Sequence, residues 1–267
     1  MSNFKLRIPA KLLILLHSFL LIPVFLFSQE EDFRQRTHYF GFEPGSNQIK
    51  ENILIPKVNR GSVIEFSYRF ENEGRNYNEV TFNIGYSKLR TKVETEKVTQ
   101  NLQMSVGYSW GKNLLPGEKV NYYLGVKANY LWTLMEFPVW DESRAYWGTV
   151  ISAGPFNRVN LAFDNNTSWI CSLQIDLIGF CSRPDEERLY AQEKWTVPNI
   201  IQITNSGFSF VTLNSFVICS LRNEYRIPLK NDNFFSFCNS ITYATVSESK
   251  GKSLQTVKIS FGFGLGF

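Results

Sequence analysis

Beyond its first 28 residues, the sequence lacks any apolar run long enough to cross a bilayer as a helix. This absence excludes a multi-helix membrane protein. Histidine is scarce, with 2 among 267 residues, and no phosphate-binding loop of the form G-x-x-x-x-G-K-[ST] occurs. The 4 cysteines show no C-x-x-C or Cys/His metal spacing. We therefore expect no metal and no cofactor, while the pairing of the cysteines stays open.

The first 28 residues are typical of a secretory signal peptide. Lys5, Arg7 and Lys11 precede an apolar run, Leu12 to Phe27, and a polar segment follows. We expect cleavage after Ser28, which leaves residues 29–267 as the mature barrel domain; an uncleaved membrane anchor is the alternative. Cleavage lowers the formal net charge from +4 to about +1, so the basic pI gives no reason to expect nucleic acid as a partner.

The chain is rich in aromatic residues and in two-residue alternation. Aromatic side chains make up 15% of the residues. From residue 62 onward, apolar and polar residues alternate in one segment after another, as in Ile64 to Glu71 and Val120 to Tyr130. The final residues, Val257 to Phe267, set apolar side chains against Lys258, Ser260 and three glycines. Strands of this kind present one apolar face and one polar or empty face.

These segments predict an all-β fold, a transmembrane antiparallel up-and-down β-barrel of about twelve strands, with ten as the fallback. The first strand is expected near 37–43 and the last at 254–267. A soluble β-sandwich is the alternative, but it would have to hide every apolar face from water.

Two expectations complete the strand count. Gly154-Pro155 is expected to form a turn between strands at 145–153 and 158–164, and a further strand is expected at 200–211. If the last strand ends in the periplasm, this count makes 181–196 an unusually long periplasmic connection.

The signal peptide, the alternating aromatic strands and the terminal Phe267 resemble those of Gram-negative outer-membrane β-barrel proteins. The resemblance covers roughly residues 37–267 and implies a position in the cell outer membrane, in contact with its lipids. It also implies insertion by the barrel assembly machinery, with Phe267 as part of the assembly signal. The resemblance is one of architecture and identifies no subfamily whose activity could be transferred.

The polar faces of the predicted strands carry charges of both signs. One interpretation is a narrow polar conduit that selects solutes by charge. The other is a lumen filled by mutually compensating ion pairs, without a pore. The lumen-facing candidates are Glu65, Arg69, Lys127, Asp176, Arg222, Glu224, Arg226 and Lys258.

We expect a non-enzymatic barrel, either a structural or partner-binding component or a small passive channel. An outer-membrane lipid hydrolase or lipid A-modifying enzyme is one alternative, and a barrel subunit of a secretion or uptake assembly is another. A serine nucleophile needs an adjacent base. After signal removal, His38 is the one histidine, and its nearest serine in sequence is Ser46. We therefore expect no catalytic residues.

Overall fold

The computed structural model describes residues 35–51, 58–91, 98–136, 145–183, 201–202, 204–231, 233–247 and 253–267. The expected signal peptide lies outside these residues. None of the described residues forms a helix long and apolar enough to cross a membrane. The strands are β1 (Gln35–Glu51), β2 (Asn59–Glu73), β3 (Asn76–Thr91), β4 (Thr99–Asn113), β5 (Val120–Glu136), β6 (Ala145–Ala162), β7 (Ser168–Asp176), β8 (Ile178–Ser182), β9 (Ser209–Thr212), β10 (Phe216–Pro228), β11 (Phe234–Ser247) and β12 (Ser253–Gly266).

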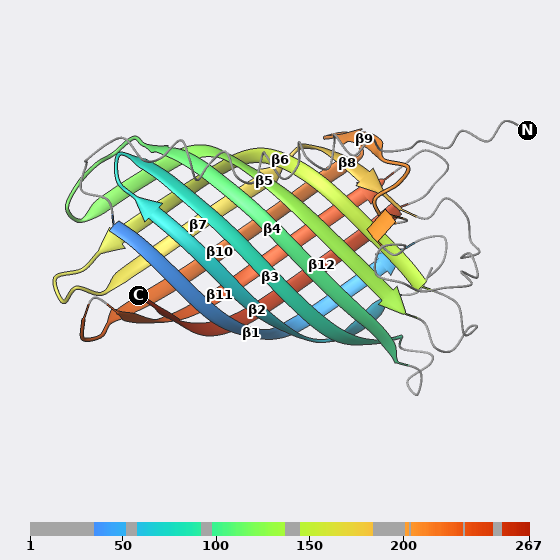
Figure 1. The fold of residues 1–267 in the computed structure, drawn as a ribbon, viewed down its shortest axis with the longest axis horizontal. Helices are drawn as coiled ribbons and strands as arrows, with labels where there is room; N and C mark the ends of the chain where they lie inside the picture. Colours follow the sequence, from blue (N-terminus) through green and yellow to red (C-terminus); the bar gives the residue numbers. More distant parts are fainter. Residues whose placement is uncertain are drawn as a thin grey trace, which may run out of the picture. The chain divides into compact units, whose positions relative to one another are not determined.

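The antiparallel sheet closes on itself as a barrel (Figure 1). The first strand pairs with the last, with Tyr39 opposite Gly266, and the ring runs from β1 through β7 and on through β10, β11 and β12. β6 pairs first with β8 and then, farther along its length, with β7. β9 pairs with the other edge of β8. The predicted fold class is confirmed: the sheet has twelve strands, and ten of them form the closed ring.

β6 runs unbroken through Gly154 and Pro155, so the predicted turn at this dipeptide is wrong. Both residues pair with β5, Gly154 with Lys127 and Pro155 with Val126. A Cβ atom at position 154 would collide with the backbone of Ile175 in β7. The glycine therefore allows two strands to approach closely, which is a known role of glycine inside a strand.

One extra residue, Leu177, separates β7 from β8. β6 pairs Phe156 with Gln174 and Ala153 with Ile178, so three steps along β6 match four along its neighbour. This is the register change of a β-bulge. It reverses the alternation, because Asp176 is buried in the lumen whereas Ile178 is 51% exposed.

The connections fix the orientation of the barrel. Short connections at 74–75, 114–119, 163–167 and 229–233 all lie at the end where Phe267 follows β12. Short turns mark the periplasmic side, so we call this the periplasmic end and the other the outer end. Ser182 pairs with Thr149 near the start of β6, at the outer end. The described start of the predicted 181–196 connection therefore lies at the outer end and not at the predicted periplasmic end, because one long β6 replaces two predicted strands and reverses the direction of the strand that follows. Residues 184–196 lie outside the described residues.

The predicted strand at 200–211 is present only in part, as β9. Just before it, Asn205 and Thr204 instead accept hydrogen bonds from β5 and β6 side chains. The hydroxyl of Tyr130 donates to Asn205 Oδ1 at 3.0 Å, and Thr149 Oγ1 donates to the Thr204 carbonyl at 2.5 Å. The Asn205 N–H donates to the Ile201 carbonyl at 3.2 Å, which is the bond of a helical turn, so this backbone lies outside the sheet ladder.

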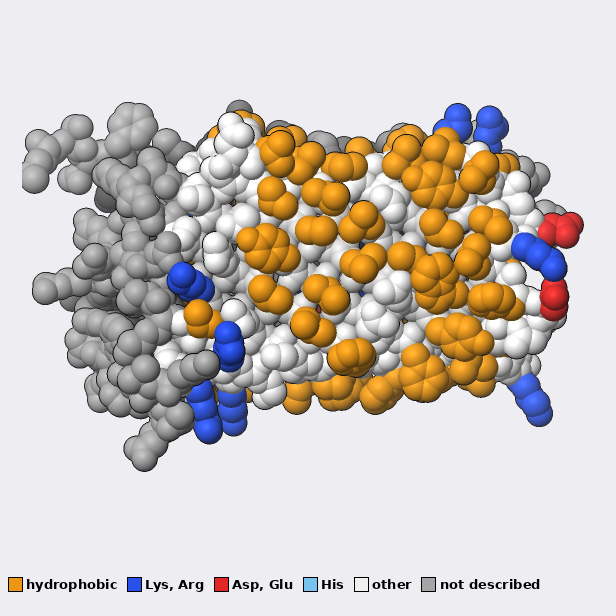
Figure 2. Space-filling model, turned by 180° about the vertical axis from the view of Figure 1, so that it is seen from behind, with side chains coloured by type: hydrophobic (Ala, Val, Ile, Leu, Met, Phe, Trp, Pro, Cys, Tyr) orange, Lys and Arg blue, Asp and Glu red, His pale blue; other side chains and the backbone are white. Residues whose placement is uncertain are grey.

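The outward faces of the strands form a broad apolar belt (Figure 2). Phe261, Phe66 and Phe40 are among its members and are 65%, 58% and 53% exposed. A continuous apolar surface of this kind is an aggregation hazard in water and is stable against hydrocarbon, where a closed barrel leaves no unpaired strand edge. The belt and the fold together place the protein in the cell outer membrane.

Candidate functional site

The lumen is filled by inward side chains that change character along the barrel. Toward the outer end Ile49, Leu89, Met135 and Tyr146 form an almost completely buried apolar cluster, beside inward polar side chains such as Asn59 and Asn101. A second apolar cluster, which includes Phe216, lies at the same end. Polar and charged residues fill the middle and the periplasmic third of the lumen.

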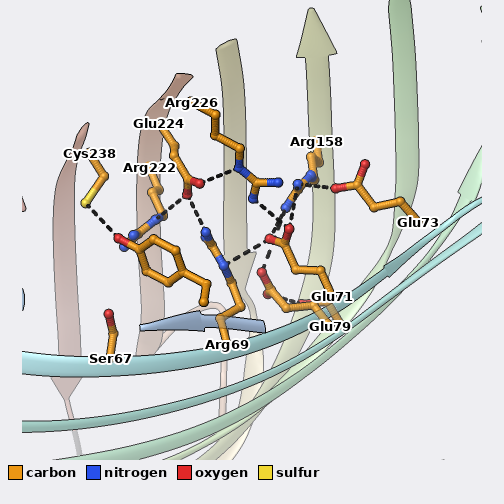
Figure 3. Close-up of polar contacts among 12 residues, drawn as sticks. Ser67, Arg69, Glu71, Glu73, Glu79, Arg158, Arg222, Glu224, Arg226 and Cys238 are labelled. Carbon is orange, nitrogen blue, oxygen red and sulfur yellow. Dashed lines mark hydrogen bonds and ion pairs between the residues drawn. The ribbon is translucent and has the colours of Figure 1, made fainter. Parts of the chain in front are cut away.

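Glu71 is the centre of an ion-pair network in the periplasmic third (Figure 3). Its carboxylate is fully buried and contacts three guanidinium groups, at 2.9 Å from Arg69 Nε, 2.8 Å from Arg158 Nη1 and 2.6 Å from Arg226 Nη2. β6 and β10, which carry two of these arginines, each lie four places from β2 around the ring. The contacts therefore bridge opposite walls of the barrel.

A second carboxylate, Glu224, extends this network toward the middle of the lumen. It accepts a hydrogen bond from Arg226 Nε at 2.6 Å and another from Arg69 Nη2. Arg222, on the same face of β10, donates to Glu43 Oε1 at 2.7 Å. A chain of ion pairs thus connects β1, β2, β6 and β10.

Two tyrosine rings lie under the arginines. The Arg69 guanidinium carbon is 4.5 Å from the centroid of the Tyr39 ring, and the Arg158 guanidinium carbon is 4.5 Å from that of Tyr77. Tyr77 also stacks on Phe156, with centroids 5.7 Å apart. Cation–π contacts of this kind stabilise guanidinium groups that have been taken out of water.

The charges that form ion pairs in the lumen balance. Burial of a charge is costly unless it is paired and hydrogen-bonded, and an ion pair in the interior needs good geometry to offset its desolvation. The ion pairs involve equal numbers of basic and acidic residues: Arg69, Arg158, Arg222, Arg226, Lys127 and Lys258 against Glu43, Glu65, Glu71, Glu73, Glu79 and Glu224. Mutual compensation is therefore the main electrostatic role visible in this lumen.

A cavity of about 170 Å³ lies in the middle of the lumen. Its walls include two further ion pairs, Lys258 Nζ to Glu65 Oε2 at 2.7 Å and Lys127 Nζ to Glu79 Oε1 at 3.2 Å. Small hydroxyl and amide side chains make up much of the remaining wall. Such a lining suits water or a small polar solute better than an apolar one.

The structure places all eight lumen-facing candidates on the inside of the barrel. Four of them, Arg69, Arg222, Glu224 and Arg226, belong to the Glu71 network. Glu65, Lys127 and Lys258 line the cavity. Asp176 stands apart and accepts hydrogen bonds from Asn129 at 2.9 Å and from Gln174 at 2.6 Å.

The sequence-based list of lumen-facing candidates omits five residues of the ion pairs: Glu43, Glu71, Glu73, Glu79 and Arg158. Glu71 is missing from the list although it lies on the polar face of the alternating segment that begins at Ile64. Glu79 lies on the same face as Thr81, two residues before it. The predicted strand began at Val80, so starting it one residue earlier would have included Glu79. Glu43 and Arg158 are the end residues of the predicted strands at 37–43 and 158–164, so both already lay within predicted strands. The alternation itself was the available signal, and it had to be continued past a predicted end only for Glu73 and Glu79.

The remaining candidate groups form no metal or disulfide site. No cluster of three or more His, Cys, Asp or Glu suited to a metal ion occurs among the described residues. Cys171, Cys181, Cys219 and Cys238 form no disulfide. Phe267 lies beside His38, with stacked rings 5.9 Å apart and backbone hydrogen bonds of 2.8 and 3.0 Å between the two residues.

Comparisons with known proteins agree with this architecture. No family model and no curated protein matches the sequence. Among solved structures, the outer membrane protease OmpT from Escherichia coli matches with a TM-score of 0.51 and 7% identity, covering 90% of this chain and 99% of OmpT. The β domain of the Bordetella autotransporter BrkA matches with a TM-score of 0.43 and 10% identity, covering 87% of this chain and 98% of that domain. At these identities the likeness concerns the fold alone.

Proposed function

We propose that this protein is a non-enzymatic outer-membrane β-barrel with a closed lumen, acting as a structural or partner-binding component. The observation that carries the proposal is the Glu71 network, which ties opposite walls together with buried, charge-balanced ion pairs. The apolar layer around Met135 adds a second barrier at the outer end. An aqueous pore would need a continuous polar path past both layers.

The surroundings of His38 support a non-enzymatic role. Its ring lies on the outward face near the periplasmic end, where Nδ1 is 2.9 Å from the hydroxyl of Tyr68. In the part of the chain that the structure describes, no serine or cysteine side chain hydrogen-bonds to this ring. Although OmpT is a protease, a likeness of 7% identity gives no ground for transferring that activity. A lipid hydrolase or lipid A-modifying enzyme therefore has no supporting observation here.

A gated passive channel is the second candidate, and the polar cavity in the middle of the lumen favours it. In this case the ion pairs at the cavity wall would line the conducting path. The two layers that bound the cavity would then have to rearrange for a solute to pass.

Single-channel recording in planar bilayers separates the two candidates. We expect the refolded protein to give no discrete current steps over a wide range of KCl concentrations and voltages. The control is a variant that lacks the exposed Lys119–Asp164 ion pair, Lys119→Ala/Asp164→Ala, whose side chains are 72% and 87% exposed; it should also be silent. Reproducible steps from the unmodified protein would overturn the closed-lumen proposal and support the channel.

Copurification tests the structural and partner-binding parts of the proposal. A protein that holds a partner should leave the membrane with it in mild detergent, in a fixed ratio and repeatedly. A chain that always emerges alone would contradict partner binding, as well as the alternative role as a subunit of a secretion or uptake assembly. Of the two roles in the proposal, only the structural one would then remain.

A further inference from the structure

Four basic side chains gather on the outward surface at the outer end of β1, β2 and β3. We call Lys50, Arg60, Lys88 and Arg90 the outer basic patch. Each is half-buried or exposed, and each alternates with an inward neighbour such as Ile49, Asn59 or Leu89 that is almost completely buried. Figure 2 shows blue side chains at this end of the apolar belt. The patch therefore faces the surrounding membrane rather than the lumen.

The register places these cations side by side. Arg60 lies directly opposite Arg90, while Lys88 lies opposite Ser62, the next outward position on β2. Arg60 also lies opposite Gln48, two residues before Lys50. Directly opposite residues on one face have Cβ atoms roughly 4.5–5.5 Å apart, and diagonal neighbours roughly 7–8 Å apart. All four cations are therefore within the reach of one multivalent anion.

No acid offsets this concentration of charge among the residues whose side chains are described. None of the four forms an ion pair with another described residue. The outward acid at this level, Glu136, lies opposite Gln100 of β4, which in turn lies opposite Lys88. It is thus two strands away from the nearest patch residue. Like charges directly opposite one another in a sheet are destabilising, and the described residues supply no counter-charge to the Arg60–Arg90 pair.

The surface below the patch identifies the kind of molecule that carries this counter-charge. Ile64, Phe66 and Ile84 continue the same outward faces and are 45%, 58% and 38% exposed. Between them and the patch lies Tyr86, whose hydroxyl donates to Gln100 Oε1 at 3.1 Å. Tyrosine prefers the boundary between hydrocarbon and headgroups. The ligand must therefore place acyl chains on the belt and anionic groups on the patch.

We infer that the outer basic patch binds the phosphate groups of a phosphorylated glycolipid in the outer leaflet. Guanidinium groups bind phosphate oxygens in pairs, and the lysines add point charges. A phosphate monoester carries about −1.5 to −2 at neutral pH. Two such groups on one lipid match four adjacent cations, whereas a phosphodiester lipid brings a single charge. The proposal does not depend on whether the lumen conducts.

The test uses the refolded full barrel in neutral detergent, with diphosphorylated lipid A as the probe. Arg60→Gln/Arg90→Gln removes the central pair, and Arg36→Gln/Arg75→Gln, at exposed positions of the periplasmic end, is the matched control. Binding is measured by native mass spectrometry and by the shift in thermal unfolding temperature. Because each basic residue near an anionic surface contributes about 1 kcal/mol, removing two should weaken binding roughly thirtyfold. The control should bind as the unmodified protein does.

A second readout separates a ligand site from a purely structural role. Without lipid, Arg60→Gln/Arg90→Gln should be at least as stable as the unmodified protein, because like-charge repulsion is removed. Dephosphorylated lipid A, phosphatidylglycerol and inorganic phosphate should each give a much smaller shift than diphosphorylated lipid A. Equal shifts from the dephosphorylated lipid, from phosphatidylglycerol or from inorganic phosphate would overturn the proposal, as would an equal loss of binding in the control.

Discussion

At the residue scale, Glu71 determines whether the lumen network is balanced. Its carboxylate is shared by three arginines that come from three strands. Its neighbour on the same face, Glu73, is 18% exposed, and Arg158 is its one ion-pair partner among the described residues. Burial makes the difference between these carboxylates, because a buried charge that loses its partner cannot be compensated by water.

We therefore expect Glu71→Ala to lower the free energy of unfolding by about 3–5 kcal/mol, the range for breaking a buried ion pair. Glu73→Ala should cost about 1 kcal/mol or less, as at partly exposed pairs. Urea titration of the folded barrel in detergent, followed by tryptophan fluorescence, measures both values. Similar losses in the two variants would mean that Glu71 has no special place in the network.

At the element scale, β12 shows why a strand can leave one face empty. Its glycines point into the lumen, where larger side chains of neighbouring strands occupy the space. A Cβ atom on Gly264 would collide with the Tyr39 ring of β1, and one on Gly266 with the Phe234 ring of β11. The glycine face of β12 thus leaves room for an aromatic ring from each neighbouring strand. One of these rings, Tyr39, lies under the Arg69 guanidinium.

Gly264→Ala should consequently destabilise the barrel by about 1–3 kcal/mol, the usual cost of overpacking. The matched control is Gly148→Ala, because the nearest atom to a new Cβ there is Leu254 Cδ2 at 4.0 Å. Thermal unfolding monitored by the shift between folded and unfolded mobility on a gel compares the two variants. If Gly148→Ala were the more harmful one, the packing account of β12 would be wrong.

At the scale of the whole molecule, the barrel separates two environments that do not meet. The belt outside is apolar, and the lumen inside is filled by ion pairs in one part and apolar clusters in another. The reactivity of Cys238 can be used to test whether water reaches the lumen. It is 6% exposed, lies inside the lumen and has its Sγ 4.0 Å from the hydroxyl of Tyr39.

With the other three cysteines replaced by alanine, Cys238 should resist a water-soluble maleimide added to both sides of liposomes, and should react fully after unfolding. A cysteine introduced at the exposed Lys119 position provides the positive control. Mass spectrometry gives the labelled fraction over time. Rapid labelling of Cys238 in the folded protein would show that water and small solutes enter the lumen.

Much of the fold could be predicted because strand alternation is a local property. The outward positions of Phe261 and Phe66 and the inward positions of Arg69 and Glu224 follow from the two-residue period alone. The errors arose where a local signal has two meanings. Gly154-Pro155 is a typical turn dipeptide, yet here it lies inside β6, since close approach to β7 requires a glycine. Leu177 gives no sequence sign of the bulge that it forms.

The sequence by itself determined that this protein is a membrane barrel with an apolar outside and a charged inside, because those features repeat every two residues along each strand. The tertiary structure decided which charges meet. Glu71 and Arg158 are far apart in sequence and lie four strands apart around the ring, and their contact depends on ring closure and register. The pairing of Arg60 with Arg90 likewise depends on register, since a shift of one residue would turn one side chain to the other face.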